Sequence, residues 1–188
     1  YKSTYSRFAL GGEYTVRSKS LKSFFQSLDI TMSLTYEKDL IDRWKFVEYS
    51  SPMPLSTSLE EGEFDVTIVP YKYEATLKVD GKPFYAYLNG TAKFRKDLGS
   101  ISNTFKTGAQ WNVNKNFGKG TIFDPERPFS VDMNVRPRDY SSIPATHQMS
   151  AFIEDNSVWT FGNGFKAEWL AGVRVAAMAG AGKEYSVN

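Results

Sequence analysis

The sequence predicts a mainly β protein, an antiparallel β-sandwich or barrel with one flanking amphipathic helix and long loops. Three observations predict this class. Aromatic residues make up 15% of the 188 residues, and aromatic side chains favour strands. Several short runs alternate apolar with polar residues, which is the period of a half-buried strand. Hydrophobic residues reach 41%, enough for a packed core, so we expect a single β-rich domain over residues 1–188.

The first clear strand is predicted over residues 30–36. Four apolar side chains alternate there with Thr31, Ser33 and Thr35. The segment before it is ambiguous, because its apolar residues have helical spacing but also fit a strand edge. Those apolar residues are Leu21, Phe24, Phe25 and Leu28.

The pattern changes period after Tyr36, where we expect the flanking helix. Four apolar residues recur at i, i+1, i+4 and i+7, which places them on one face of a helix that packs against the sheet. Pro52 and Pro54 would end this helix. The predicted core face is Leu40, Ile41, Trp44 and Val47.

Further strands are expected in the rest of the chain. Asp80-Gly81 lies between two alternating runs and predicts a two-residue hairpin turn, with Pro83 at an edge position. Alternation also predicts strands over 64–68, 129–135 and 149–155. Two more strands would join at the turn 162–164, followed by a flexible C-terminal tail at about 177–188.

A long polar loop is predicted at about 99–123, from Gly99 to Phe123. It contains no Asp or Glu but interleaves basic and aromatic residues, a pattern that fits a contact with an acidic neighbouring subunit. Two alternatives are a site for single-stranded nucleic acid and a plain solvated loop. The candidate subunit- or surface-contact residues are Lys106, Trp111, Lys115, Phe117 and Lys119.

Composition argues against most catalytic chemistry. The chain has no cysteine, which excludes disulfides and thiolate metal sites, and its net charge of +2 is too weak to indicate nucleic-acid binding. The single histidine, His147, lies in a predicted loop without a nucleophile motif. We therefore expect no enzyme activity, no cofactor and no metal. The absence of an initiator Met and of a signal peptide indicates a processed or trimmed start.

Residues 29–51, "DITMSLTYEKDLIDRWKFVEYSS", resemble the strand-then-helix element of long-tailed bacteriophage tail tube proteins. The resemblance rests on Asp29, Asp39, Arg43 and Glu48 with their aromatic neighbours. It implies a subunit that forms rings through continuous sheets, with the helix packed outside and no catalytic residues.

Residues 64–90, "FDVTIVPYKYEATLKVDGKPFYAYLNG", resemble the strand–Pro–strand segment of aerolysin-like pore-forming proteins. That resemblance implies a protein that inserts β-strands into a membrane.

The leading hypothesis from the sequence is a non-enzymatic structural subunit of a symmetric assembly, most plausibly a phage-tail or other virion protein. Its partners would be copies of itself and neighbouring structural subunits, and it would belong to a virion assembled in the host cytoplasm. The alternative is a secreted, membrane-active β-pore former. A third hypothesis is an enzyme or small-ligand binder that uses a β-lined pocket.

Overall fold

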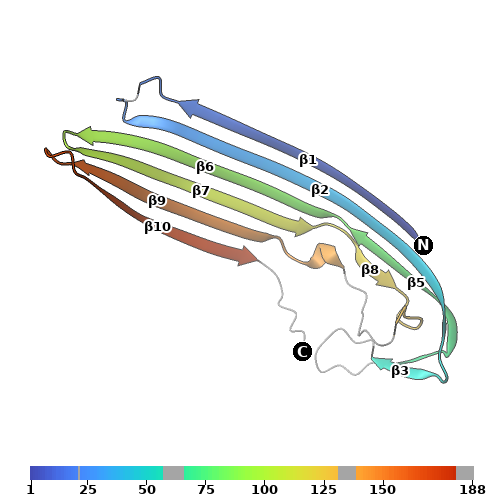
Figure 1. Ribbon diagram of the computed structural model, residues 1–188. Helices are drawn as coiled ribbons and strands as arrows, with labels where there is room; N and C mark the ends of the chain where they lie inside the picture. Colours follow the sequence, from blue (N-terminus) through green and yellow to red (C-terminus); the bar gives the residue numbers. More distant parts are fainter. Residues whose placement is uncertain (21, 57–65, 131–138, 181–188) are drawn as a thin grey trace.

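The computed structural model describes residues 1–20, 22–56, 66–130 and 139–180, and this part of the chain is almost entirely antiparallel β-structure (Figure 1). It contains no α-helix, only one short 3₁₀ turn, η1 (Tyr140–Ser142). The strands are β1 (Lys2–Arg17), β2 (Phe25–Glu48), β3 (Met53–Ser56), β4 (Val66–Val69), β5 (Lys72–Gly81), β6 (Pro83–Leu98), β7 (Ile101–Asn116), β8 (Gly120–Phe123), β9 (Thr146–Thr160) and β10 (Lys166–Gly180).

The main sheet has eight strands and is open rather than closed into a barrel. Its order is β10-β9-β7-β6-β2-β5-β8, with β1 paired to the free side of β2. Six long strands lie side by side in the order β1, β2, β6, β7, β9 and β10, so that β1 and β10 form the two open edges (Figure 1). β3 and β4 form a separate two-stranded sheet.

The predicted flanking helix is wrong, because its residues continue β2. This strand pairs with β1 along one side and with β6 and then β5 along the other. The apolar spacing that suggested a helix arises because both faces of this part of β2 carry apolar residues. Val47 is buried on one face, whereas Trp44 on the opposite face is 66% exposed. The ambiguous segment before it is resolved as strand from Phe25 onward.

The predicted hairpin at Asp80-Gly81 is also wrong. β5 and β6 run on in nearly the same direction, and both pair with β2 in one unbroken register, from Glu48↔Lys72 to Leu28↔Ala92. A hairpin at Asp80-Gly81 would pair β5 with β6. Instead, β5 and β6 lie end to end, and both pair with the single long strand β2.

The predicted polar loop is a strand instead. β7 pairs with β6 through a two-residue turn in which Gly99 has a φ of 61°, a conformation that suits glycine. β8 continues β7 after a local irregularity. Pro83 pairs with Asn116 but Asp80 pairs with Gly120, so residues 117–119 lie opposite residues 81–82 as a bulge.

The two strands predicted on either side of the turn at 162–164 are confirmed, and the short strand predicted over 149–155 is part of the first of them, β9. β9 and β10 form a hairpin whose turn includes Gly164, with a φ of 82°. Residues 177–180 of the predicted tail belong to β10, and the rest of the tail lies outside the described residues. Most of the strand expected over 129–135 also lies outside them.

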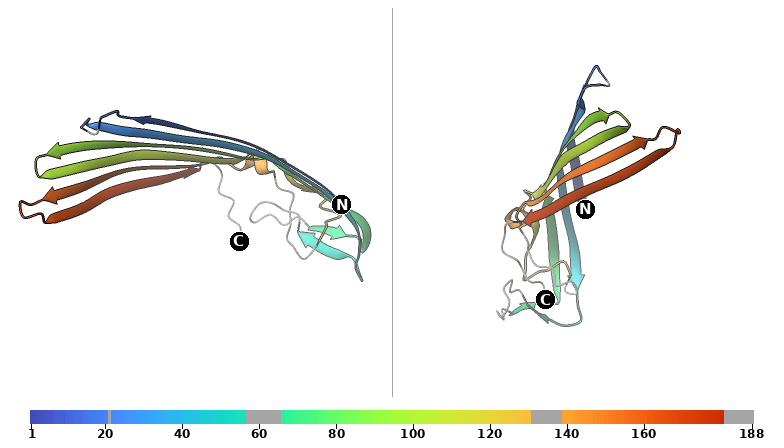
Figure 2. Two further views of the ribbon diagram at one scale, coloured as in Figure 1. Left: turned by 45° about the horizontal axis from the view of Figure 1, so that its top comes forward. Right: turned by 90° about the vertical axis from the view of Figure 1, so that its left-hand side faces the viewer.

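The small core lies at one end of the molecule, where the last part of β2 pairs with β5. Val47, Val69, Tyr73 and Ala75 pack together there. The Tyr73 hydroxyl donates a hydrogen bond to the Pro128 carbonyl oxygen over 2.7 Å. Burial raises the pKa of Tyr73 to about 12, with a further contribution from the neighbouring Tyr49. The sheet curves toward this end, and β3 lies on the concave side of the bend (Figure 2).

Candidate functional site

The six long strands form a sheet whose two faces differ in chemistry. Side chains alternate between the faces along a strand, and directly paired residues share a face. The pairing registers therefore sort the side chains into rows that cross all six strands.

One face, which we call the apolar face, carries no charged side chain in four successive rows. The first row is Leu10, Leu34, Ala86, Val113, His147 and Ala179; the second is Gly12, Met32, Leu88, Trp111, Met149 and Ala177; the third is Tyr14, Ile30, Gly90, Ala109, Ala151 and Val175; the fourth is Val16, Leu28, Ala92, Thr107, Ile153 and Val173. We call these four rows the apolar band.

Aromatic residues border the apolar band at both ends. The bordering rows are Phe8, Tyr36, Phe84 and Lys115 at one end and Phe25, Phe94, Phe105, Asp155 and Ala171 at the other. The rings of Phe25 and Phe94 meet edge to face with centroids 6.0 Å apart. Phe84 and Phe94 lie on the same strand, ten residues apart. The aromatic rows are therefore about 34 Å apart along the strands, at about 3.4 Å per residue.

Three polar side chains inside the apolar band make hydrogen bonds within the protein. The Trp111 Nε1–H donates to His147 Nδ1 over 3.3 Å, and the two rings stack with an interplanar angle of 10°. The Thr107 hydroxyl donates to the Phe152 carbonyl oxygen over 2.9 Å. These contacts reduce the cost of placing the three side chains in an apolar environment.

The opposite face, which we call the polar face, carries mainly Ser, Thr, Asn, Gln and charged residues, together with a few large side chains such as Tyr87 and Phe152. The Thr15 hydroxyl donates to Asp29 Oδ1 over 2.9 Å, and the Arg174 guanidinium donates to the Ser150 hydroxyl over 3.2 Å. The charged side chains on the polar face at the level of the apolar band are Glu13, Arg17, Asp29, Lys93, Lys106, Glu154 and Arg174.

Most of the apolar face is uncovered within the described chain, although Val113 is buried. Leu88 is 44% exposed, Ile153 is 57% exposed and Val175 is 66% exposed. The whole chain exposes 13556 Å². A compact folded monomer of 21.3 kDa exposes roughly 9,100 Å² by the usual scaling of area with mass. An open sheet that leaves both of its faces uncovered accounts for a large exposed area of this kind.

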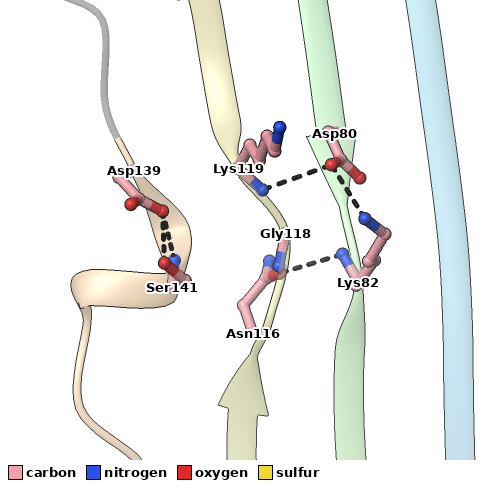
Figure 3. A network of polar contacts seen from close by, with 7 residues as sticks. All are labelled: Asp80, Lys82, Asn116, Gly118, Lys119, Asp139 and Ser141. Carbon is pink, nitrogen blue, oxygen red and sulfur yellow. Dashed lines mark hydrogen bonds and ion pairs between the residues drawn. The ribbon is translucent and has the colours of Figure 1, made fainter.

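A polar cluster lies just beyond the aromatic row that contains Phe84 (Figure 3). The Lys82 ammonium group donates to Asp80 Oδ2 over 2.9 Å, and the Lys119 backbone N–H donates to the same oxygen over 3.4 Å. The Asn116 side-chain oxygen accepts the backbone N–H groups of Lys82 and Gly118, each over 2.9 Å. The cluster therefore ties residues 80–82 to the bulge at 117–119.

The charges of this cluster are held in their ionised forms. Burial alone raises the pKa of the Asp80 carboxyl, but the hydrogen bonds from Lys82 and from the Lys119 backbone outweigh burial and leave that pKa below its ordinary value. The same hydrogen bond raises the pKa of Lys82. Nearby, Ser141 donates two hydrogen bonds to the Asp139 carboxylate and lowers the pKa of Asp139 (Figure 3).

The apolar side chains change face at the level of the polar cluster. In β6 the even-numbered residues from Phe84 to Phe94 point to the apolar face, whereas in β5 the odd-numbered Tyr73 and Ala75 are buried on the other side. β2 keeps one register with both strands, so the change reflects the sequence rather than a shift in pairing. The apolar band thus ends at a defined level, and a small packed region begins beyond it.

The five predicted contact residues do not form one surface. Lys106 lies on the polar face of β7, and Trp111 lies in the apolar band. Lys115 donates to the Ser141 carbonyl oxygen over 2.7 Å. Phe117 is 53% exposed and meets Phe84 edge to face, and the Lys119 backbone belongs to the polar cluster. A role in subunit contacts stays a prediction.

The apolar face was not identified from the sequence. Its signal is the alternation of large or small apolar residues with polar ones in residues 84–94 and 105–113, which is visible only once 99–123 is treated as a strand. Among the described residues, no group of three or more His, Cys, Asp or Glu side chains is placed to hold a metal ion. The same part of the chain contains no helix long and apolar enough to cross a membrane.

Comparison with models of protein families, with curated proteins and with solved structures found no match.

Proposed function

We propose that this protein crosses a lipid bilayer with its six long strands and lines a water-filled passage with its polar face. The apolar band, free of charge and bordered by aromatic rows, is the observation that carries this proposal. Proteins that cross membranes with strands alternate apolar, lipid-facing residues with polar, water-facing ones, and they place aromatic residues at the two interfaces.

The height of the apolar band matches a bilayer. Its aromatic rows are about 34 Å apart along the strands, which corresponds to about 24–28 Å across the membrane at strand tilts of about 35–45°, close to the apolar band of about 25 Å that such proteins carry. The hydrocarbon core of a typical bilayer is about 30 Å thick. Lipid acyl chains would cover the exposed apolar area, which no described segment of the chain covers.

The polar cluster fits a position at the membrane boundary. Asp80 and Lys82 lie next to Phe84, an aromatic residue of the bordering row, and Lys115 lies in that row. Charged groups are stable in the headgroup region but costly within the hydrocarbon core. The small core around Tyr73 would then lie outside the bilayer.

The leading hypothesis from the sequence, a virion structural subunit, stays a prediction without further support. The helix that its tail-tube resemblance implies is part of β2, and a water-soluble assembly would need another protein to cover the apolar face. The proposed role corresponds instead to the membrane-active alternative.

The test uses single cysteines in the cysteine-free chain, labelled with an environment-sensitive fluorophore after reconstitution into lipid vesicles. Ser33→Cys and Leu34→Cys form a matched pair of adjacent positions on opposite faces. We expect a lipid-attached quencher to act on position 34 and aqueous iodide to act on position 33. Equal quenching at both positions, or a protein that does not insert, would refute the proposal.

A further inference from the structure

We infer that β10 of one copy pairs with β1 of a second copy, so that several copies close a ring of strands in the membrane. This inference rests on the proposed membrane role and names the partner that completes it. It concerns the two open edges of the sheet, β1 and β10.

The open edges are incompatible with lipid unless they are paired. In an antiparallel sheet, about half the residues of an edge strand direct their N–H and C=O groups outward. β1 spans 16 residues and β10 spans 15, and much of each strand lies at the level of the apolar band. Unpaired backbone groups are costly in the hydrocarbon core because no water is there to bind them, so strands that span membranes do not keep open edges.

The direction of the strands favours a head-to-tail junction between copies. All five pairings among the six long strands are antiparallel, so β1 and β10 run in opposite directions. β10 of one copy can therefore pair antiparallel with β1 of the next while both copies keep the same orientation in the membrane. The apolar faces then lie on the same side and the small cores at the same end.

Closure within one copy is disfavoured by the contents of the polar face. Eight strands enclose an interior just wide enough for side chains, and six enclose less. The polar face carries bulky residues, including Tyr85, Tyr87 and Phe152, besides its charged side chains. Further strands are needed to enclose these groups together with water.

The two edges carry complementary charges in a register that places Glu13 opposite Arg174. Arg17 is then diagonal to Glu168, so both acidic groups face a basic group on the polar face. On the apolar face of the same register, Leu10 lies opposite Ala177 and Tyr14 lies opposite Val173. Opposite charges and aromatic–β-branched pairs both stabilise neighbouring strands.

The experiment is thiol cross-linking of the full chain in lipid vesicles. In the inferred register Gly11 lies opposite Ala176 on the polar face, and a side chain at Gly11 meets only ordinary contacts. We expect the Gly11→Cys/Ala176→Cys variant, treated with a short bifunctional thiol reagent, to form a ladder of multimers that ends at the ring size. The control, Gly11→Cys/Ala177→Cys, places the second thiol on the other face. We expect it to form no cross-linked multimer larger than a dimer.

Mixing singly substituted chains separates the remaining explanations. A Gly11→Cys chain mixed with an Ala176→Cys chain should form cross-linked heterodimers. A cross-link within one chain, without a ladder, would show that a copy closes on itself and would overturn the inference. No cross-link in protein that keeps the alternating quenching of positions 33 and 34 would assign the edges to another partner, overturning the inference but not the proposed function.

Charge exchange provides a second readout. Glu13→Arg alone should weaken the ladder, because it places two cations side by side, and Glu13→Arg/Arg174→Glu should restore it. A ladder that is insensitive to both changes would contradict the register.

Discussion

A lysine introduced into the middle of the apolar band should destabilise the membrane-inserted protein strongly, whereas the same lysine one residue away should not. Ala109 lies in the third row of the apolar band, paired with Gly90 and Ala151, and Gln110 lies beside it on the polar face. The comparison is between Ala109→Lys and Gln110→Lys, which add the same charge to the same strand.

The magnitude follows from the position of Ala109 between the two aromatic rows. Four residues separate it from Phe105 and six from Lys115, or about 14 Å and 20 Å along the strand. At a tilt of about 40° these distances correspond to depths of about 10 Å and 16 Å. A lysine near the bilayer midplane on a lipid-facing strand costs about 2–4 kcal/mol, and a lysine facing the passage costs about zero.

The assay is equilibrium unfolding in lipid vesicles with denaturant, followed by tryptophan fluorescence. Ala109→Lys should lower the free energy of unfolding by about 2–4 kcal/mol, and Gln110→Lys should lie within about 0.5 kcal/mol of the parent protein. An equal loss for the two variants would refute the assignment of the faces. A loss below about 1 kcal/mol at Ala109 would show that this face does not contact the hydrocarbon core.

Three further predictions concern packing and the polar cluster. Gly108→Ala should cost about 1–3 kcal/mol of folding stability in denaturant titrations, because its Cβ would lie 2.6 Å from the Phe152 ring and 2.7 Å from the Gly90 carbonyl oxygen; an unchanged midpoint would contradict this close packing of β7. The Asp80 carboxyl has a lowered pKa when folded, so its stabilising contribution is complete above its ordinary pKa of about 4 and is lost as the pH falls through the folded value. Asp80→Asn should therefore lose less stability than the parent chain below about pH 4, and parallel curves would contradict this. Trp44→Ala should cost less than about 1 kcal/mol, since Trp44 is 66% exposed, whereas the buried Val47→Ala should cost about 2 kcal/mol; the reverse order would restore the helix interpretation.

Some elements could be predicted from the sequence and others could not, for identifiable reasons. The alternation in residues 30–36 and the glycine turn at 162–164 depend on local chemistry, and both are confirmed as a strand and a hairpin. The segment after Tyr36 was misassigned because its apolar residues serve both faces of β2, a pattern that mimics helical spacing. Residues 99–123 have the polar composition of a loop. One face of β7 is polar, and its opposite face carries Thr and Ala as well as larger apolar residues, so the apolar alternation is weak.

The alternation of apolar and polar residues already indicates a protein built from antiparallel strands with two different faces, because side-chain direction in a strand follows a period of two. Which alternating runs share a face follows only from the fold, because it depends on the pairing registers of strands far apart in the chain. Those registers place Leu10, Leu88 and Val175 on one uncovered surface and Glu13, Lys93 and Arg174 on the other. They also show that Asp80-Gly81 continues a strand instead of turning, since β2 provides pairing partners on both sides of it.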